Sequence, residues 1–211
     1  MDAHDWDRRY ADTELVWSSR PNLFVESELA DLSPGRAIDV AAGEGRNSIW
    51  LAGRGWRVTA VDFSQAGLDK GRALQEDQAR GRDLSVDWVC ADALTYEPEG
   101  KFDLAVLAYL QLPAAQRRTA VRRSFGWLRD GGTLFVVAHD STNLTEGTGG
   151  PQYPEVLYTA EDVLADLDGE RFEVARAERV AREVPSQADS PDDTPRTAYD
   201  ALVRVVRTDP L

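Results

Sequence analysis

Short apolar segments alternate with longer amphipathic segments up to about residue 140. The short segments are bounded by turn residues, as buried parallel strands are, and the longer ones have helical spacing. The expected strands are 36–41, 56–62, 86–90, 102–108 and 133–138, and the expected helices are about 46–54, 64–80 and 114–128. This order is typical of successive βαβ units, so we predict an α/β fold with a doubly wound, Rossmann-like sheet.

The pattern changes towards the C-terminus. Residues 172–183 and 198–207 alternate apolar and polar positions, as half-exposed antiparallel strands do, and predict a terminal hairpin. Their connection, 185–196, is polar and proline-rich, and we expect a surface loop rather than a linker between domains. The 211 residues therefore predict a single domain. We divide it into a helical lid (1–30), a core (36–140) and an acceptor-side loop with the hairpin (141–211).

Composition narrows the function. A net charge of -13 repels phosphate backbones, which argues against a nucleic-acid partner. The N-terminus has no signal-peptide pattern and no apolar run reaches the roughly 18 residues of a membrane span, so we expect a cytoplasmic protein with no membrane partner. One cysteine and two histidines predict no metal site, and Cys90 is expected in the core rather than as a nucleophile. The sequence predicts no particular oligomeric state.

The segment AIDVAAGEGRNSIWLA places Asp39, Gly43 and Gly45 where the first strand turns into a helix. Glycines lack a Cβ, so the backbone there can approach a ligand closely. Asp62 ends the second strand, seventeen residues beyond Gly45, and is placed to accept hydrogen bonds from ribose hydroxyls. An adenosine-containing ligand fits this pattern.

Two features favour S-adenosylmethionine over NAD. Asp39 lies where NAD would put its negative pyrophosphate, and Ser48 stands where the dinucleotide fingerprint has its third glycine. S-adenosylmethionine carries a sulfonium and an ammonium, which a carboxylate attracts directly or through water. Asp92, after the third strand, is placed to accept from the adenine amino group while Ala93 donates its N–H. Alternatively, these aspartates are helix or turn caps.

The runs DVAAGEGRN, VDFS, CADA and FDLAVLAYLQLP resemble the successive motifs of class I S-adenosylmethionine-dependent methyltransferases. Within that superfamily, DWDRRYADTELVWSSRPN, GRNS and HDSTNLTEGTGGPQYPEVLYTAEDV resemble the tellurite-resistance and thiopurine/thiol methyltransferase-like group. The resemblance implies a seven-stranded sheet with an antiparallel last strand and methylation of a small, often soft acceptor such as a thiol. Ala41 departs from the family's glycine pattern and is expected to crowd the methionine tail slightly.

Methyl transfer is an in-line displacement that depends mainly on positioning, so a base is optional. We expect His139, at the end of the fifth strand, to be the best base and the adjacent Asp140 to orient it through a neighbour or hold the ligand. Alternatively, His139 caps the strand end. His4 is expected on the surface. Arg46 either steers an anionic acceptor or bonds its own turn.

Trp6, Tyr10 and Trp17 share one face if the N-terminal segment is helical, and form either ordinary core packing or a lid over the site. Tyr109 and Gln111 stand where amino-group methyltransferases carry an Asn/Asp-Pro-Pro-aromatic signature, and its absence argues against amide or exocyclic-amine acceptors. The stretch 142–154 is either an acceptor-side wall or a connector. The expected cofactor contacts are Tyr10, Asp39, Ala41, Gly43, Gly45, Asn47, Asp62, Phe63, Asp92, Ala93 and Ala108; the expected acceptor contacts are Trp6, Trp17, Arg46 and Tyr109.

The leading hypothesis is therefore methyl transfer from S-adenosylmethionine, with S-adenosylhomocysteine as product, to a small-molecule acceptor, with sulfur favoured and O- or N-methylation as alternatives. An NAD-dependent oxidoreductase and a module that only senses S-adenosylmethionine are the rivals. Turnover separates the sensor from the enzyme, and NADH binding would support the oxidoreductase.

Overall fold

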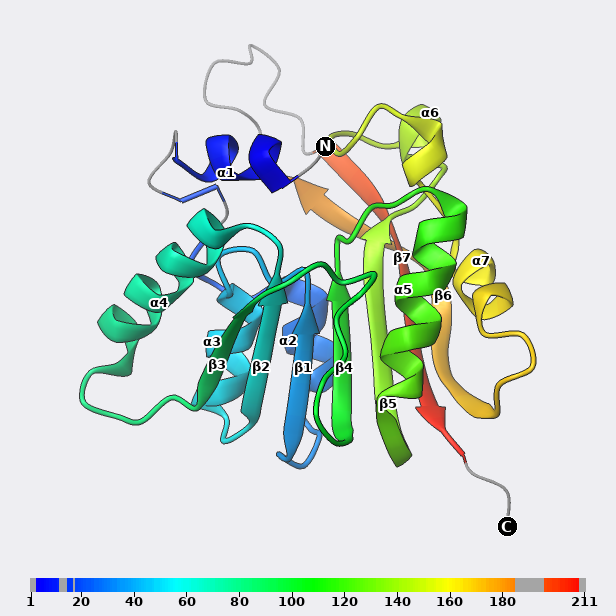
Figure 1. Ribbon diagram of the computed structural model, residues 1–211. Helices are drawn as coiled ribbons and strands as arrows, with labels where there is room; N and C mark the ends of the chain where they lie inside the picture. The colour runs from blue at the N-terminus through cyan, green and yellow to red at the C-terminus, as the bar shows by residue number, and fades with distance from the viewer. Residues whose placement is uncertain (1–2, 12–14, 17, 185–195, 209–211) are drawn as a thin grey trace.

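A seven-stranded sheet forms the centre of the protein in the computed structural model, which describes residues 3–11, 15–16, 18–184 and 196–208 (Figure 1). Its strand order is β3 (Val86–Cys90), β2 (Arg57–Asp62), β1 (Arg36–Val40), β4 (Phe102–Ala108), β5 (Leu128–His139), β7 (Arg196–Arg207) and β6 (Phe172–Val184). The first five strands in this order are parallel, and β7 is antiparallel to both neighbours. The predicted doubly wound sheet and its antiparallel last strand are confirmed.

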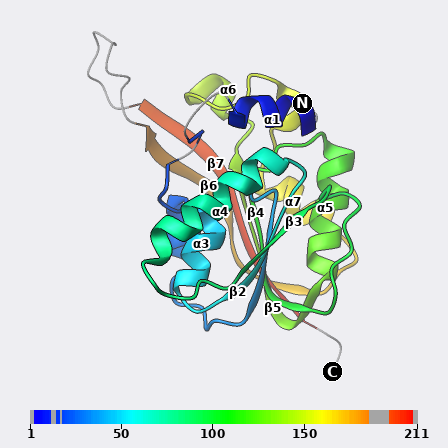
Figure 2. The ribbon, with the colours of Figure 1, turned by 60° about the vertical axis from the view of Figure 1, so that its left-hand side comes forward.

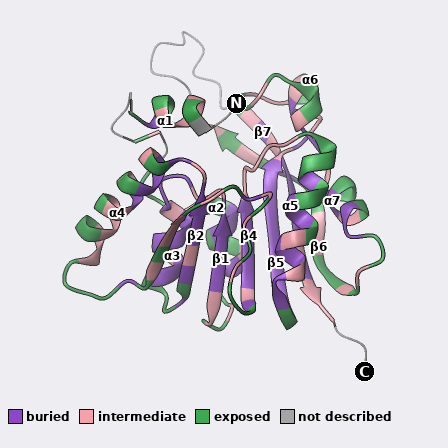
Figure 3. Cartoon of the chain, viewed as in Figure 1, coloured by how far each residue is buried: buried purple, intermediate pink, exposed green. Residues whose placement is uncertain are grey.

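Helices cover both faces of the sheet (Figures 1 and 2). One face packs against α2 (Leu23–Leu29), α3 (Arg46–Gly53) and α4 (Gln65–Ala79), and the other against α5 (Ala114–Gly126) and α7 (Ala160–Asp166). The strands at the centre of the sheet are buried on both faces, whereas the outer faces of the helices are exposed (Figure 3). Alternate residues of β1 belong to opposite cores: Ile38 packs towards α5 and Ala37 towards α3.

Short elements lie at the carboxyl edge of the sheet. The helix α1 (Ala3–Ala11) and the short helix α6 (Asn143–Glu146) are both at this end (Figures 1 and 2). The 3₁₀ helix η1 (Pro154–Val156) follows α6 and leads to α7. No described helix is long and apolar enough to span a membrane.

The start of the fifth strand was predicted wrongly. β5 begins at Leu128 rather than Thr133, and α5 ends at Gly126. Phe102 pairs with Leu128 but Leu104 pairs with Thr133, so β5 contains extra residues here, among them Gly131 at φ +73°. The Asp130-Gly131-Gly132 signal therefore forms an irregularity inside the strand instead of ending the helix.

The expectation that Cys90 is a core residue is also wrong. Cys90 is exposed, and its Sγ lies 3.6 Å from the carbonyl oxygen of Phe63. β3 is the edge strand of the sheet and its residues are only half-buried or exposed. An apolar run on an edge strand does not reach the burial of a central strand.

A buried ion pair joins α5 to α7. Arg117 donates from Nε to Asp166 Oδ2 at 2.6 Å, and Arg118 donates to Oδ1 at 3.2 Å. Asp166 is fully buried and Arg117 is 7% exposed, and the guanidinium lies over the ring of Tyr158. A charge left here without its partner cannot be solvated cheaply.

We expect Asp166→Asn to lower the free energy of unfolding by about 3 kcal/mol, because it leaves Arg117 buried without a counter-charge. Urea unfolding followed by circular dichroism measures the change. Asp168→Asn, at an exposed position two residues away, is the matched control and should change it by less than about 0.5 kcal/mol. Equal effects of the two substitutions would contradict the structural role of the pair.

Candidate functional site

The candidate site lies where β1 and β4 adjoin and their connections leave to opposite faces of the sheet. Backbone in the left-handed region is concentrated there: Ala41 has φ +60°, Gly43 +56° and Gly45 +68° after β1, and Tyr109 has +61° after β4. This conformation costs a non-glycine residue of order 1 kcal/mol, and it persists where surrounding contacts enforce it, often at binding sites. Ala41 thus departs from the glycine pattern at a position that favours glycine.

The two glycines of the turn serve different purposes. Gly43 donates its N–H to Asp62 Oδ2 at 2.8 Å, which ties the turn to the end of β2. At Gly45, an added Cβ would lie 2.1 Å from the ring of Trp88. The Trp88 ring of β3 therefore requires glycine at this position, and the expected cofactor contact of Gly45 stays a prediction.

Asp39 is a buried carboxyl at the end of β1, with 1% exposed surface. Burial raises its pKa to about 6, and the charge of Asp62 adds to this, while the Ser48 hydrogen bond and the charge of Arg46 oppose it. The Ser48 hydroxyl donates to Oδ2 at 2.6 Å, and the Ser48 backbone also contributes a hydrogen bond to this carboxylate. The serine in place of a third glycine therefore holds Asp39.

Asp62 lies at the end of β2 with 8% exposed surface. Burial raises its pKa, and the N–H groups of Ser64 and Gly43 oppose that shift. Oδ1 accepts from the Ser64 N–H at 2.8 Å and Oδ2 from Gly43, and the Phe63 N–H adds a further hydrogen bond to this carboxylate.

The N-terminal helix α1 docks beside this carboxylate. Asp7 accepts from the Ser64 hydroxyl at 2.5 Å and from the Ala66 N–H at 3.2 Å, at the start of α4. Tyr10 is buried, lies against Gly67 and stacks on the half-buried Trp6, with 5.5 Å between the ring centroids. Helix α1 therefore covers the carboxyl edge next to Asp62.

The expected lid of residues 1–30 divides into parts with different roles. Phe24, Val25 and Leu29 of α2 belong to the core, so this helix is not a lid. Trp17 lies outside the described residues. Asn47 accepts the Asn22 N–H at 2.9 Å on its side-chain oxygen, and thus holds the chain that enters α2.

The remaining expected cofactor contacts line the end of β3 and β4. Asp92 is exposed, and its Oδ1 accepts the Leu94 N–H at 2.8 Å, as in a turn cap. Ala93 is buried beside it, whereas Phe63 and Ala108 are half-buried. Asp92 therefore both caps its turn and keeps an exposed carboxylate oxygen.

On the far side of β4, four side chains form a connected group. His139 Nδ1 lies 3.2 Å from Asp200 Oδ1, and Tyr109 and Arg182 donate to Oδ2 at 3.0 and 2.9 Å. Asp200 is fully buried; burial opposes its ionisation, but hydrogen bonds from His139 and Arg182 outweigh that and keep its pKa below the usual value. Burial, and next the charge of Asp200, raises the pKa of Tyr109.

The expected role of Asp140 in orienting the imidazole is wrong. Its Oδ1 accepts from the Thr142 N–H at 2.9 Å and from the Thr142 hydroxyl at 2.7 Å, so it caps the next turn. The partner of His139 is Asp200, opposite it in the β5–β7 ladder, so the imidazole faces a carboxylate rather than strand-end carbonyls. Sequence reasoning missed Asp200 and Arg182. The sequence did contain a signal for Asp200. Ala198, Asp200 and Leu202 alternate along the strand and share its buried face, and a buried charge there needs polar partners.

Arg46 lies between the two halves of the site. Burial lowers its pKa, and so does the charge of Arg182, while Tyr109, Asp39 and Glu44 oppose the shift. The charges of Asp39 and Tyr109 therefore both act on the Arg46 guanidinium.

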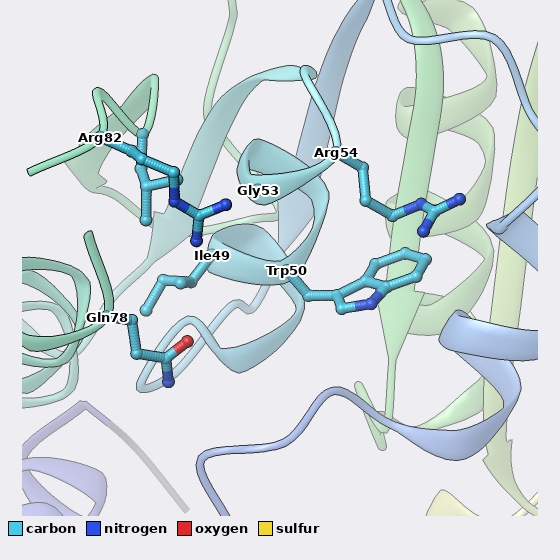
Figure 4. Close-up of a pocket in the computed structure, with 7 residues that line it drawn as sticks. Ile49, Trp50, Gly53, Arg54, Gln78 and Arg82 are labelled. Carbon is cyan, nitrogen blue, oxygen red and sulfur yellow. The ribbon is translucent and has the colours of Figure 1, made fainter. Parts of the chain in front are cut away.

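A separate pocket lies between α3 and α4. It is lined by Ile49, Trp50, Gly53, Arg54, Gln78, Arg82 and Leu84 (Figure 4). None of the residues expected to bind cofactor or acceptor lines it. Arg54 lies over the ring of Trp50 there, 5.2 Å from its centroid. No group of three possible metal ligands occurs within the described part of the chain.

Residues 37–132 match the family described as methyltransferase domain. Ribosomal RNA small subunit methyltransferase C of Alcanivorax borkumensis is 30% identical over 113 residues, which cover 50% of this chain and 33% of that protein. Thiopurine S-methyltransferase of Pseudomonas putida is 26% identical over 176 residues, covering 72% and 78%. The chain spans from a third to about half of the length of the first curated relatives it matches.

Among solved structures, N-methyltransferase NodS of Bradyrhizobium japonicum in complex with S-adenosylhomocysteine is 19% identical, with 98% of each chain covered and a TM-score of 0.68. At 19% identity, the similarity to this structure shows a shared fold and nothing about the substrate. Residues 37–132 therefore match a methyltransferase domain, and the chain has the fold of the N-methyltransferase NodS.

Proposed function

We propose that the protein transfers the methyl group of S-adenosylmethionine to a small-molecule acceptor, a thiol or another soft nucleophile. The observation that carries this proposal is the pair of buried carboxyls, Asp39 and Asp62, around the turn after β1. Asp39 is so poorly compensated that its pKa rises to about 6. A ligand with a cationic group supplies the missing charge, whereas a pyrophosphate would add repulsion.

The site residues fit this ligand. Asp39 would accept from its ammonium directly or through water, and Asp62 would accept from the ribose hydroxyls. Asp92 would accept from the adenine amino group while the Ala93 N–H donates to the ring. When bound, S-adenosylmethionine supplies an electrophilic methyl group on sulfur. The protein contributes by holding the acceptor in line, and α1, with Tyr10 and Trp6, excludes water.

A small, soft acceptor is supported by the similarity to a thiopurine S-methyltransferase over 72% of the chain. The net charge of -13 disfavours nucleic acid, and the similarity to the ribosomal RNA enzyme covers a third of that protein. O- and N-methylation of small molecules are the alternatives to be tested in the same assay.

We expect Asp62→Ala to weaken binding of S-adenosylhomocysteine by roughly 10- to 100-fold, since charge-assisted hydrogen bonds contribute about 1.5–3 kcal/mol. Isothermal titration calorimetry measures this, with Asp87→Ala on the exposed side of β3 as the matched control. Circular dichroism checks that the variant is folded. Unchanged affinity would remove Asp62 from the ribose site, and binding of NADH instead would replace the proposed cofactor.

Turnover with a panel of thiols, selenols, phenols and amines tests the reaction itself. Release of S-adenosylhomocysteine identifies the acceptor class, and we expect thiols or selenols to react fastest. Tight cofactor binding without turnover on any acceptor would make the protein a sensor.

Cofactor affinity should depend on pH through Asp39. A cation binds the ionised carboxylate, so with a pKa of about 6 the affinity for S-adenosylhomocysteine should be level above pH 7. Below pH 6, binding must expel a proton from Asp39, and affinity should fall by up to about tenfold per pH unit. Calorimetry from pH 5 to 8 measures this slope. In Asp39→Asn the slope should disappear and affinity at pH 7 should drop; a slope that persists would assign the effect to another group.

A further inference from the structure

We propose that Asp200 fixes His139 as the base of this site, so that the site is built for acceptors whose nucleophilic atom still carries its proton. This inference rests on the proposed methyl transfer and adds its acceptor class. The contacts that carry it involve side chains from β5, β6, β7 and the end of β4.

The first step concerns the tautomer of His139. Its Nδ1 faces Asp200 Oδ1 at 3.2 Å, and neither of these two buried atoms has another hydrogen-bond partner among the described residues. Asp200 Oδ2 already accepts from Tyr109 and Arg182, so Asp200 is held as a carboxylate by donors on one oxygen. A carboxylate only accepts hydrogen bonds, so the proton of the neutral imidazole belongs on Nδ1. The lone pair of Nε2 is then available.

The second step concerns the fixed position of the ring. Its backbone N–H donates to Gln111, and the ring of Tyr109 packs against it with 4.9 Å between centroids. A Cβ added at Gly150 would lie 2.7 to 2.9 Å from three ring atoms, so that loop lies directly on the imidazole. Nε2 forms no hydrogen bond within the described part of the chain. His139 is thus packed on its sides and satisfied at one nitrogen.

The third step places the ring beside the cofactor site. His139 ends β5, and Tyr109 follows β4. β4 lies between β5 and β1 in the sheet, and β1 carries Asp39. The charges of Asp39 and Tyr109 both act on Arg46. An acceptor between these residues would have Nε2 on one side and the turn after β1 on the other.

The reaction then balances as follows. The acceptor's heteroatom gives a lone pair to the methyl carbon, and the bond from that carbon to the donor sulfur breaks with its electrons going to sulfur. The acceptor's proton moves to Nε2, Asp200 stabilises the resulting imidazolium, and water takes the proton afterwards. A nucleophile that is already ionised needs no such base.

Nitrogen-15 NMR of histidine-labelled protein tests the role of Asp200 without any ligand. Only two histidines are present, and His4→Gln leaves His139 as the single signal. At pH 9 we expect the Nδ1–H form in the otherwise native protein and a shift towards Nε2–H in Asp200→Asn. Nε2–H in the otherwise native protein would overturn the inference, as would an unchanged tautomer in a folded Asp200→Asn.

Kinetics test the acceptor class with two thiols. At pH 7, 4-nitrobenzenethiol is ionised, whereas 2-mercaptoethanol carries its proton. We expect Asp200→Asn and His139→Gln to lower kcat/KM for the protonated thiol by roughly 10- to 100-fold and for the ionised thiol less than about threefold. Gly150→Ala, which displaces the ring, should give the same pattern. Glu178→Gln, an exposed position on β6, is the control.

The two proposals fail in distinguishable ways. Equal losses with both thiols, at unchanged affinity for S-adenosylhomocysteine, would make Asp200 merely structural and overturn the inference while methyl transfer stands. Absence of cofactor binding or of turnover would overturn the proposed function and with it the acceptor class, whereas NMR would still decide whether Asp200 fixes the tautomer of His139.

Discussion

The carboxylate of Asp62 connects the three segments on which the candidate site depends. One oxygen accepts from Gly43 in the turn after β1, and the other from Ser64 at the start of α4. The Ser64 hydroxyl in turn donates to Asp7 of α1. A single buried charge at the end of β2 therefore sets the shape of the turn, caps the next helix and positions the residues that cover both. Burial makes this charge costly, and the hydrogen bonds that offset the cost also give the site its form.

Sequence patterns predicted most strands well, and the central strands β1 and β4 are buried on both faces. β3 and β4 have the predicted bounds. The errors occurred where local signals compete with tertiary structure. The Asp130-Gly131-Gly132 signal is a turn signal in isolation, yet β4 pairs with the residues on either side of it. Cys90 looks buried in its apolar run, but no strand lies outside β3.

The candidate site could be predicted from sequence only for residues that lie in the motifs at the ends of successive core strands. Asp39, Asp62 and Asp92 each follow or end a strand, so knowledge of strand order was enough to bring them to one edge. To place Asp200 in the site, the register of β7 against β5 had to be known, because a shift of one residue turns its side chain to the opposite face of the sheet. Gly45 shows the reverse difficulty: the residue was identified, but the ring of Trp88 that explains it comes from a strand more than forty residues away.

The division between core and C-terminal region also explains why the similarity to a methyltransferase domain includes some residues of the candidate site and not others. The match to the methyltransferase domain ends at residue 132, so it includes the three carboxylates and excludes His139, Arg182 and Asp200. Those residues lie on the last part of the sheet, where β6 and β7 are fixed to β5 by antiparallel pairing and by the ion pairs around Asp200. A cofactor common to many enzymes requires a constant core, whereas each acceptor requires its own polar groups on the adjoining strands. The charges follow the same division: burial raises the pKa of Asp39 after β1, whereas Asp200 is faced by His139, Tyr109 and Arg182.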